Sequence, residues 1–171
     1  MSISIQYRGC LAWSGNVSAL TEEVSDIARS MAWAYEVWDE DWKTPINAHF
    51  ESIRGVGIQI VGHSALRGIC LHPHPQIEPL WLVFRPDGSL SSPFHIALDA
   101  GEGYPPRSVW LSIKTGGAGP KIHAAIVRLL DYLDKRYCLR LEIQDAAGFF
   151  NSGDEEKLNL LFRAMDAVRM D

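Results

Sequence analysis

The chain has 171 residues, of which 47% are apolar, and it is acidic, with a formal net charge of −5. This length and composition indicate a single folded globular domain over residues 1–171 and exclude a disordered chain. The acidic balance argues against nucleic acid as a partner, because nucleic-acid binding usually requires a basic surface. It is compatible with a basic protein partner.

The sequence also predicts a compartment. No apolar run approaches the ~20 residues that span a membrane, so no membrane contact is expected. Residues 1–8 lack the basic start and long apolar core of a signal peptide, which predicts a cytoplasmic location. The three cysteines, Cys10, Cys70 and Cys138, are widely spaced and odd in number, so buried reduced thiols are expected.

The N-terminal half predicts a strand, a long helix and several further strands. Alternating apolar residues predict a strand over 2–11. A helix is expected from about residue 19, with Ser18 as its N-cap and an apolar stripe that continues to Trp38. Residues 46–60 alternate again but contain glycines, which favours two short strands or one strand with a bulge.

The C-terminal half continues with strands and ends in helices. Residues 80–85 are apolar on both faces and predict a central strand. A return strand is expected over 90–98, with Pro93 confining part of it to an edge or a bulge. Further strands are expected over 66–71, 108–113 and 139–145, and helices from Pro120 and from Ser152, which has capping-box spacing to Glu155.

Together these elements predict the α+β class. We expect a mostly antiparallel sheet of about five to seven strands, with three helices packed largely on one face. The unit 108–145 contains a strand, a glycine-rich loop, a helix and a second strand. Such a unit can form a parallel crossover, which would be right-handed.

An unusual mixture of aromatic and acidic residues lies between positions 33 and 42. Three of the six tryptophans fall there together with four carboxylates. If exposed, such a surface suits a basic partner, because tryptophan anchors dominate interface energies and acidic rims speed association. The alternative is that the aromatic residues complete the core, which we expect for Trp38. The interaction residues predicted here are Trp33, Asp39, Asp41 and Trp42.

A glycine-rich loop precedes the helix that begins at Pro120. Unpaired N–H groups and the positive end of the helix dipole would suit a phosphate or a carboxylate there. The loop lacks the residue spacing of a P-loop or a dinucleotide fingerprint. A turn that only packs the helix on the sheet explains the same glycines. The alternative ligand-binding residues are Gly116, Gly117, Gly119, Lys121, His123 and, at the end of the next strand, Asp145.

A short His-Pro-His stretch follows the strand over 66–71. Two residues apart in an extended chain, His72 and His74 point the same way and could bind one divalent metal, with Glu78 as a third ligand. Specific zinc patterns are longer than this. The main interpretation is therefore a proline-punctuated loop and no cofactor, with a metal at His72 and His74 as the alternative.

No motif names a reaction, so two functions from different classes stay open. The first is a non-enzymatic protein-interaction module that uses the acidic–aromatic surface; an inhibitor or immunity-type protein is one form of it. The second is an enzyme or ligand-binding protein with a site built from the 72–78 loop, the 115–123 loop and Asp145. This second hypothesis requires His72 or His74 to lie close to His123 or Asp145. A homo-oligomer is compatible with either.

Overall fold

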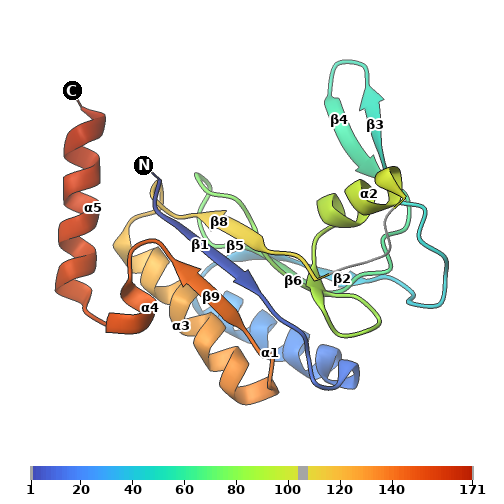
Figure 1. The fold of residues 1–171 in the computed structure, drawn as a ribbon, viewed down its shortest axis with the longest axis horizontal. Coiled ribbons are helices and arrows are strands. Elements are labelled where there is room, and N and C mark those ends of the chain that lie inside the picture. Colours follow the sequence, from blue (N-terminus) through green and yellow to red (C-terminus); the bar gives the residue numbers. More distant parts are fainter. Residues whose placement is uncertain (1, 104–107, 171) are drawn as a thin grey trace.

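The protein was analysed as a computed structural model, which describes residues 2–103 and 108–170. Among these residues every strand pairing is antiparallel, and the chain is α+β, as expected (Figure 1). The strands are β1 (Ser4–Arg8), β2 (Ala34–Asp39), β3 (His49–Ile53), β4 (Gly57–Val61), β5 (Arg67–His72), β6 (Leu80–Phe84), β7 (Leu90–Ser91), β8 (Leu111–Lys114) and β9 (Glu142–Asp145). The helices are a 3-10 turn (Ser14–Asn16), α1 (Val17–Ser30), α2 (Pro93–Glu102), α3 (Pro120–Tyr137), α4 (Phe149–Ser152) and α5 (Glu155–Arg169).

The strands form three sheets rather than the single sheet expected. A three-stranded sheet has the order β8-β1-β9, a four-stranded sheet has the order β2-β5-β6-β7, and β3 and β4 form a hairpin. The first two are joined by an isolated bridge between Cys10 and Ser89. The sheet divides here because β8 and β9 occupy both edges of β1, so β1 has no free edge to offer β6.

The unit over 108–145 is confirmed as strand, loop, helix and strand, but its two strands are not neighbours. Ile5 of β1 pairs with Ile113 of β8 on one side and with Asp145 of β9 on the other. Because both pairings are antiparallel, β8 and β9 run in the same direction with β1 between them. The C-terminal ends of β8 and β9 therefore lie at the same end of this sheet, and α3 starts there.

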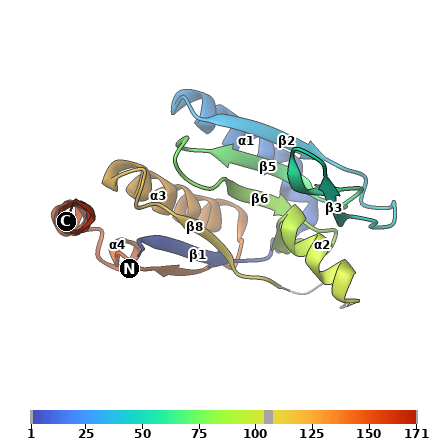
Figure 2. The same cartoon turned by 90° about the horizontal axis from the view of Figure 1, so that it is seen from above.

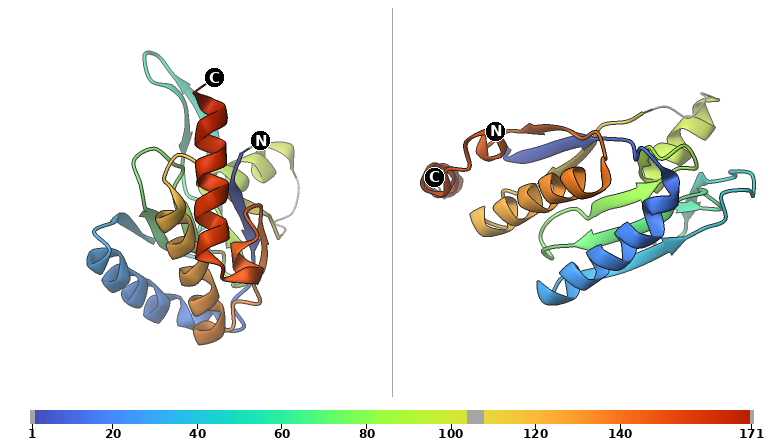
Figure 3. Two further views of the ribbon diagram at one scale, coloured as in Figure 1. Left: turned by 90° about the vertical axis from the view of Figure 1, so that its left-hand side faces the viewer. Right: turned by 90° about the horizontal axis from the view of Figure 1, so that it is seen from below.

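One hydrophobic core joins both larger sheets to their helices. It combines Tyr7 of β1 and Ile69 of β5 with Val24 of α1, Leu130 of α3 and Phe162 of α5. Helices α1 and α3 lie side by side on the same face of the strands (Figure 3). A smaller cluster around Val83 and Ile96 packs α2 on the opposite face of β6.

The long N-terminal helix ends earlier than its apolar stripe predicts. Helix α1 stops at Ser30, and Ala32 adopts a left-handed conformation with φ of 56°. Residues 34–39 then form β2, which pairs in register with β5. The spacing of apolar residues in this stretch fits a strand as well as a helix, and aromatic and β-branched side chains favour the strand.

Two further expectations about the elements are wrong. Residues 93–102 form α2, not the end of a strand, because Ser92 caps the His95 N–H and Pro93 occupies the first turn. The last helix is capped by Asp154, whose carboxylate accepts from the Lys157 N–H, while Ser152 belongs to α4.

Candidate functional site

The end of the three-stranded sheet where β8 and β9 finish and α3 begins contains a buried polar network. Thr115 follows β8, His123 lies in the first turn of α3, and Asp145 ends β9. The Thr115 hydroxyl lies 2.7 Å from His123 Nδ1, and His123 Nε2 lies 3.0 Å from Asp145 Oδ1. The second contact is poorly aligned with the ring N–H, so it is electrostatic more than a directed hydrogen bond. Sequence reasoning named His123 and Asp145 but missed Thr115.

The Thr115 hydroxyl has a second contact. It lies 3.4 Å from the Ile3 carbonyl oxygen, so it bridges His123 Nδ1 and the chain just before β1, while His123 Nε2 faces the Asp145 carboxylate. Burial acts to raise the pKa of the Asp145 carboxyl, but His123 and the N–H groups of Phe150 and Ala147 outweigh it. The pKa of Asp145 therefore lies below its usual range, and the group is held as a carboxylate.

A chain of hydroxyl, imidazole and carboxylate is the arrangement that general-base catalysis uses. Here it is closed to a substrate, because the side chains of His123 and Asp145 are 0% and 2% exposed and Thr115 is also buried. None of the four surface hollows found beside α1 and α3 is lined by these three residues. The geometry fits a role in joining the start of α3 to the ends of two strands.

The glycine loop is explained largely by its backbone. Gly119 has φ of 90°, a conformation that suits glycine, and it immediately precedes α3. Gly117 packs against the 72–78 loop, where an added Cβ would lie 3.4 Å from the Gln76 carbonyl oxygen. Gly116 faces the guanidinium of Arg169 at the end of α5. The glycines therefore permit close contacts on two sides of the loop.

The histidine loop lies beside the glycine loop, where Gln76 faces Gly117, and its histidines have local partners. His72 Nε2 lies 3.9 Å from Cys70 Sγ, and His74 Nδ1 accepts from the Gln76 N–H at 3.2 Å. Glu78 instead accepts from the N–H of Lys114. Within residues 2–103 and 108–170, no group of three or more His, Cys, Asp or Glu side chains is arranged to hold a metal ion.

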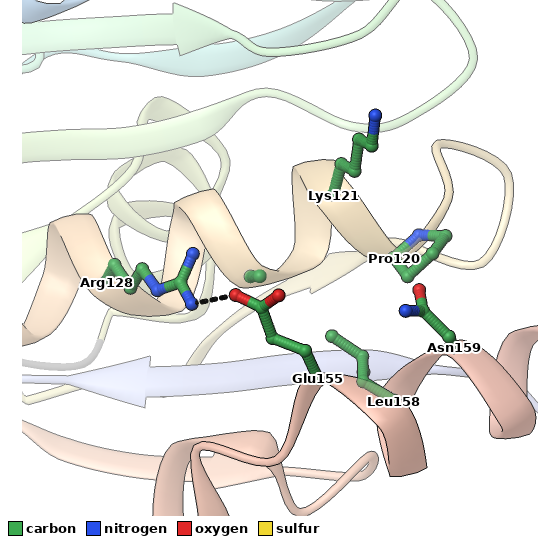
Figure 4. A pocket seen from close by; sticks show the side chains of 7 residues that line it. Pro120, Lys121, Arg128, Glu155, Leu158 and Asn159 are labelled. Carbon is green, nitrogen blue, oxygen red and sulfur yellow. Dashed lines mark hydrogen bonds and ion pairs between the residues drawn. The ribbon is translucent and has the colours of Figure 1, made fainter.

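A hollow of about 170 Å³ opens between the first turns of α3 and of α5 (Figure 4). Arg128 and Glu155 form an ion pair across it. Lys121 lies at its rim and points away from that pair, while Asn159 faces Pro120. Glu155 neutralises Arg128, and the remaining cation of the lining, Lys121, points away, so this hollow adds no support to the anion-binding interpretation.

The structure separates the residues of the acidic–aromatic stretch. Trp33 is 7% exposed and belongs to the core, so the expectation that it stands on the surface is wrong. Trp42 is half-buried and donates its indole N–H to the Phe84 carbonyl oxygen. Asp39 and Asp41 are exposed; Asp39 pairs with Arg67 at 2.6 Å.

Asp41 is partly engaged by its own turn. Its carboxylate accepts from the Lys43 N–H and from the Thr44 hydroxyl, and these bonds hold its pKa below the usual range. His63 ties the same segment to the base of the hairpin, with Nε2 2.6 Å from the Asp41 carbonyl oxygen and Nδ1 3.3 Å from Glu40. The acidic segment therefore has a fixed position beside the β3–β4 hairpin.

The hairpin itself carries a surface that sequence reasoning missed. It projects from the body next to α2 (Figure 1), and its apolar side chains are unusually open, with Val56 62% and Ile58 75% exposed. Phe50 stacks edge-on against Phe94 of α2 at 5.5 Å, and both are exposed. We call Phe50, Val56, Ile58 and Phe94 the hairpin patch. Their alternation looks like that of a core strand, so only the fold reveals the exposure.

Comparisons with known proteins do not assign this surface. No family model, no curated protein and no solved structure matches the chain. Across residues 2–103 and 108–170, no helix combines the length and the apolar character needed to cross a membrane.

Proposed function

We propose that this chain is a non-enzymatic protein-interaction module that docks a partner on the hairpin patch. The observation that carries the proposal is the exposure of Val56 and Ile58 at the end of a projecting hairpin, continuous with two aromatic rings at its base. Single exposed apolar residues are normal on a protein surface. A contiguous group that joins two elements is characteristic of a binding site.

The register of the hairpin supports a continuous patch. Phe50 pairs with Ile60 and Ser52 with Ile58, so Phe50 and Ile58 lie on the same face of the hairpin. Diagonal neighbours on one face are within reach of aromatic and long side chains. Helix α2 covers Ile60 but leaves Ile58 open. A partner that covers Ile58 would complete the burial that α2 begins.

Asp39 and Asp41 remain in the proposal as its acidic flank, because the His63 contacts hold their segment against the hairpin base. With a net charge of −5, the module favours a basic partner, whose approach the flank would accelerate. Inhibition of a basic toxin or enzyme is one form of this function. We also propose a cytoplasmic location, where a thiol such as that of Cys70 stays reduced. The enzyme hypothesis has less support, because the His123 network is closed to substrate.

The test is affinity capture from the native host, with the wild type and two matched variants as baits. The double variant Val56→Ser/Ile58→Ser removes the apolar end of the patch. The double variant Leu160→Ser/Val168→Ser removes two residues of similar exposure, 61% and 76%, from α5. We expect a captured protein that the wild type and the α5 variant retain and the hairpin variant loses.

Thermal melts of all three baits establish that each is folded, so that a lost partner reports the surface and not the fold. The captured protein is then purified and titrated against each bait. Equal affinity of the hairpin variant and the wild type, or no protein retained by any folded bait, would overturn the proposal.

A further inference from the structure

The outer edge of β2 is open. β2 is the terminal strand of the order β2-β5-β6-β7, and among the described residues its only strand partner is β5. It runs along the margin of the molecule, with α1 beneath it (Figures 2 and 3). Open edges are usually blocked by proline, lysine or a bulge. β2 has no proline, lysine or bulge over its six residues, its charged residues Glu36 and Asp39 are both acidic, and its register with β5 is unbroken.

The register identifies which backbone groups face outward. The Glu40 N–H donates to the Leu66 carbonyl oxygen, and this bond continues the β2–β5 register. In an antiparallel ladder the bonded residues alternate, so even-numbered residues of β2 bond inward. The N–H and C=O groups of Tyr35, Val37 and Asp39 therefore point to the open edge. Val37, in the middle of this edge, is 55% exposed.

A hollow of about 300 Å³ lies beside this edge on the α1 face. Val37 and Asp39 line it from β2, and Ser18, Thr21 and Glu22 line it from α1. The carboxylates of Glu22 and Asp39 outnumber the one cation in the lining, Arg67, which already pairs with Asp39. The buried hydroxyl oxygen of Thr21 has no hydrogen-bond partner among the described residues. The hollow thus offers polar and negative groups to a side chain that enters along the edge.

We propose that β2 binds an extended, lysine- or arginine-containing segment of a partner polypeptide. The segment adds a strand to the four-stranded sheet and places one basic side chain in the hollow. Backbone bonds to the outward groups of β2 would give the segment its affinity, and the hollow would select its charge. This inference goes beyond the proposed function, because it concerns a surface other than the hairpin patch and a defined chemistry of partner. A second copy of this chain fits less well, since it would bring the same acids to the edge.

The probe is a short fluorescent peptide of alternating valine and lysine, with a valine–glutamate peptide as its charge control. Anisotropy titrations measure affinity, and hydrogen exchange followed by NMR locates the contact. We expect binding of the lysine peptide alone, with new protection of the amides of Tyr35, Val37 and Asp39. The amides of Glu36 and Trp38 already lie in the β2–β5 ladder and should change little. Charge attraction without strand addition would not produce this alternation.

The decisive variant is Val37→Pro, which removes an outward N–H without touching the inward ladder. We expect it to weaken binding at least about tenfold, because it blocks pairing at the middle of the edge. Val37→Thr keeps the N–H and suits a strand, so it should bind like the wild type. If Val37→Pro does not fold, Glu22→Gln tests the role of charge in binding of the lysine peptide. Its control is Glu156→Gln on the exposed face of α5. The hydrogen-exchange pattern is measured on the wild type and needs no variant.

Three results of the peptide experiments would overturn the inference. They are unchanged affinity in folded Val37→Pro, equal binding of the glutamate peptide, and protection that does not alternate along β2. Self-association of the wild type that Val37→Pro abolishes would assign the edge to a second copy and would also overturn it. Failure here is distinguishable from failure of the proposed function. A captured protein that is lost with Val56→Ser/Ile58→Ser but kept with Val37→Pro leaves the hairpin patch standing.

Discussion

The hydroxyl of Tyr7 on β1 donates to the carbonyl oxygen of Trp81 on β6 at 2.9 Å and accepts from the N–H of the same residue at 3.0 Å. One side chain thus satisfies both backbone groups at an edge of β6 that β1 cannot reach as a strand. Burial raises the pKa of Tyr7 well above its usual range, although the bond to Trp81 opposes this. The phenol therefore stays neutral and joins the two larger sheets.

Replacing Tyr7 with phenylalanine should destabilise the protein. The variant leaves the Trp81 N–H and C=O without their partner, and an unsatisfied buried polar group costs about 1–3 kcal/mol. Urea unfolding at neutral pH measures the loss. Tyr132→Phe is the matched control, because its hydroxyl bonds to Glu23 at an exposed site and its loss should cost about 0.5 kcal/mol or less. Equal losses in the two variants would contradict this role of Tyr7.

The thiols of Cys70 and Cys138 should differ widely in reactivity. Burial raises the pKa of the Cys70 thiol to about 12, and the charge of Glu36 adds to this effect. Cys138 is exposed. Because the thiolate is the reactive form, we expect a disulfide reagent at pH 8 to label Cys138 at least about a hundredfold faster than Cys70. Mass spectrometry of the labelled peptides measures both rates, with Cys70→Ser to assign the slow signal. Comparable rates would show that β5 is open to solvent.

The Asp145 carboxylate should contribute stability that depends on pH. Since its folded pKa is lowered below 3.8, this stability is present above that value and is lost as the pH falls through the folded pKa. Asp145→Asn should cost about 2 kcal/mol at pH 7, because the carboxylate accepts two backbone N–H bonds. The difference in the free energy of unfolding between Asp145→Asn and the wild type should decrease below about pH 4. Asp166→Asn on the exposed face of α5 should show neither effect in unfolding experiments across this range. A constant difference at all pH values would contradict the charged role.

Gly68 should be among the glycines that tolerate substitution least. Its φ is 143°, and an added Cβ would overlap the Leu82 carbonyl oxygen of β6. Gly57, at φ of 103°, has no atom within 4 Å of such a Cβ, so it carries only the backbone strain. We expect Gly57→Ala to cost about 1 kcal/mol and Gly68→Ala about 2–4 kcal/mol, since overpacking adds to strain. Thermal unfolding of the two variants separates these terms, and similar melting temperatures would contradict the overlap.

Local patterns predicted the elements whose signals are unambiguous. Pro120 starts α3, and the strands β5 and β6 lie where their apolar runs indicated. The stretch that became β2 was ambiguous, because its spacing fits both periods and the turn at Ala32 carries no glycine or proline signal. Tertiary pairing with β5 decided it. Division of the sheet follows from the pairing of β1 with both β8 and β9, which no local pattern encodes.

The candidate sites show the same limit. The sequence predicts His123 as part of the glycine loop and Asp145 at the end of a strand, where α/β folds usually place their sites. Their burial could not be foreseen, because it depends on α5 and on the loops that close over them. Phe50 and Ile58 have the sequence pattern of core residues. They are exposed because α2 covers only part of this face of the hairpin.

The central position of β1 has a consequence for synthesis of the protein. Tyr7 pairs with Leu111 and Ile143, so β1 is synthesised about a hundred residues before its strand partners. Contacts of such long sequence separation slow folding, because the loop that joins them must close first. Until then β1 is an unpaired apolar strand of a nascent chain, which is a target for chaperones and for aggregation. The three-stranded sheet can therefore be completed only after β9 has been synthesised.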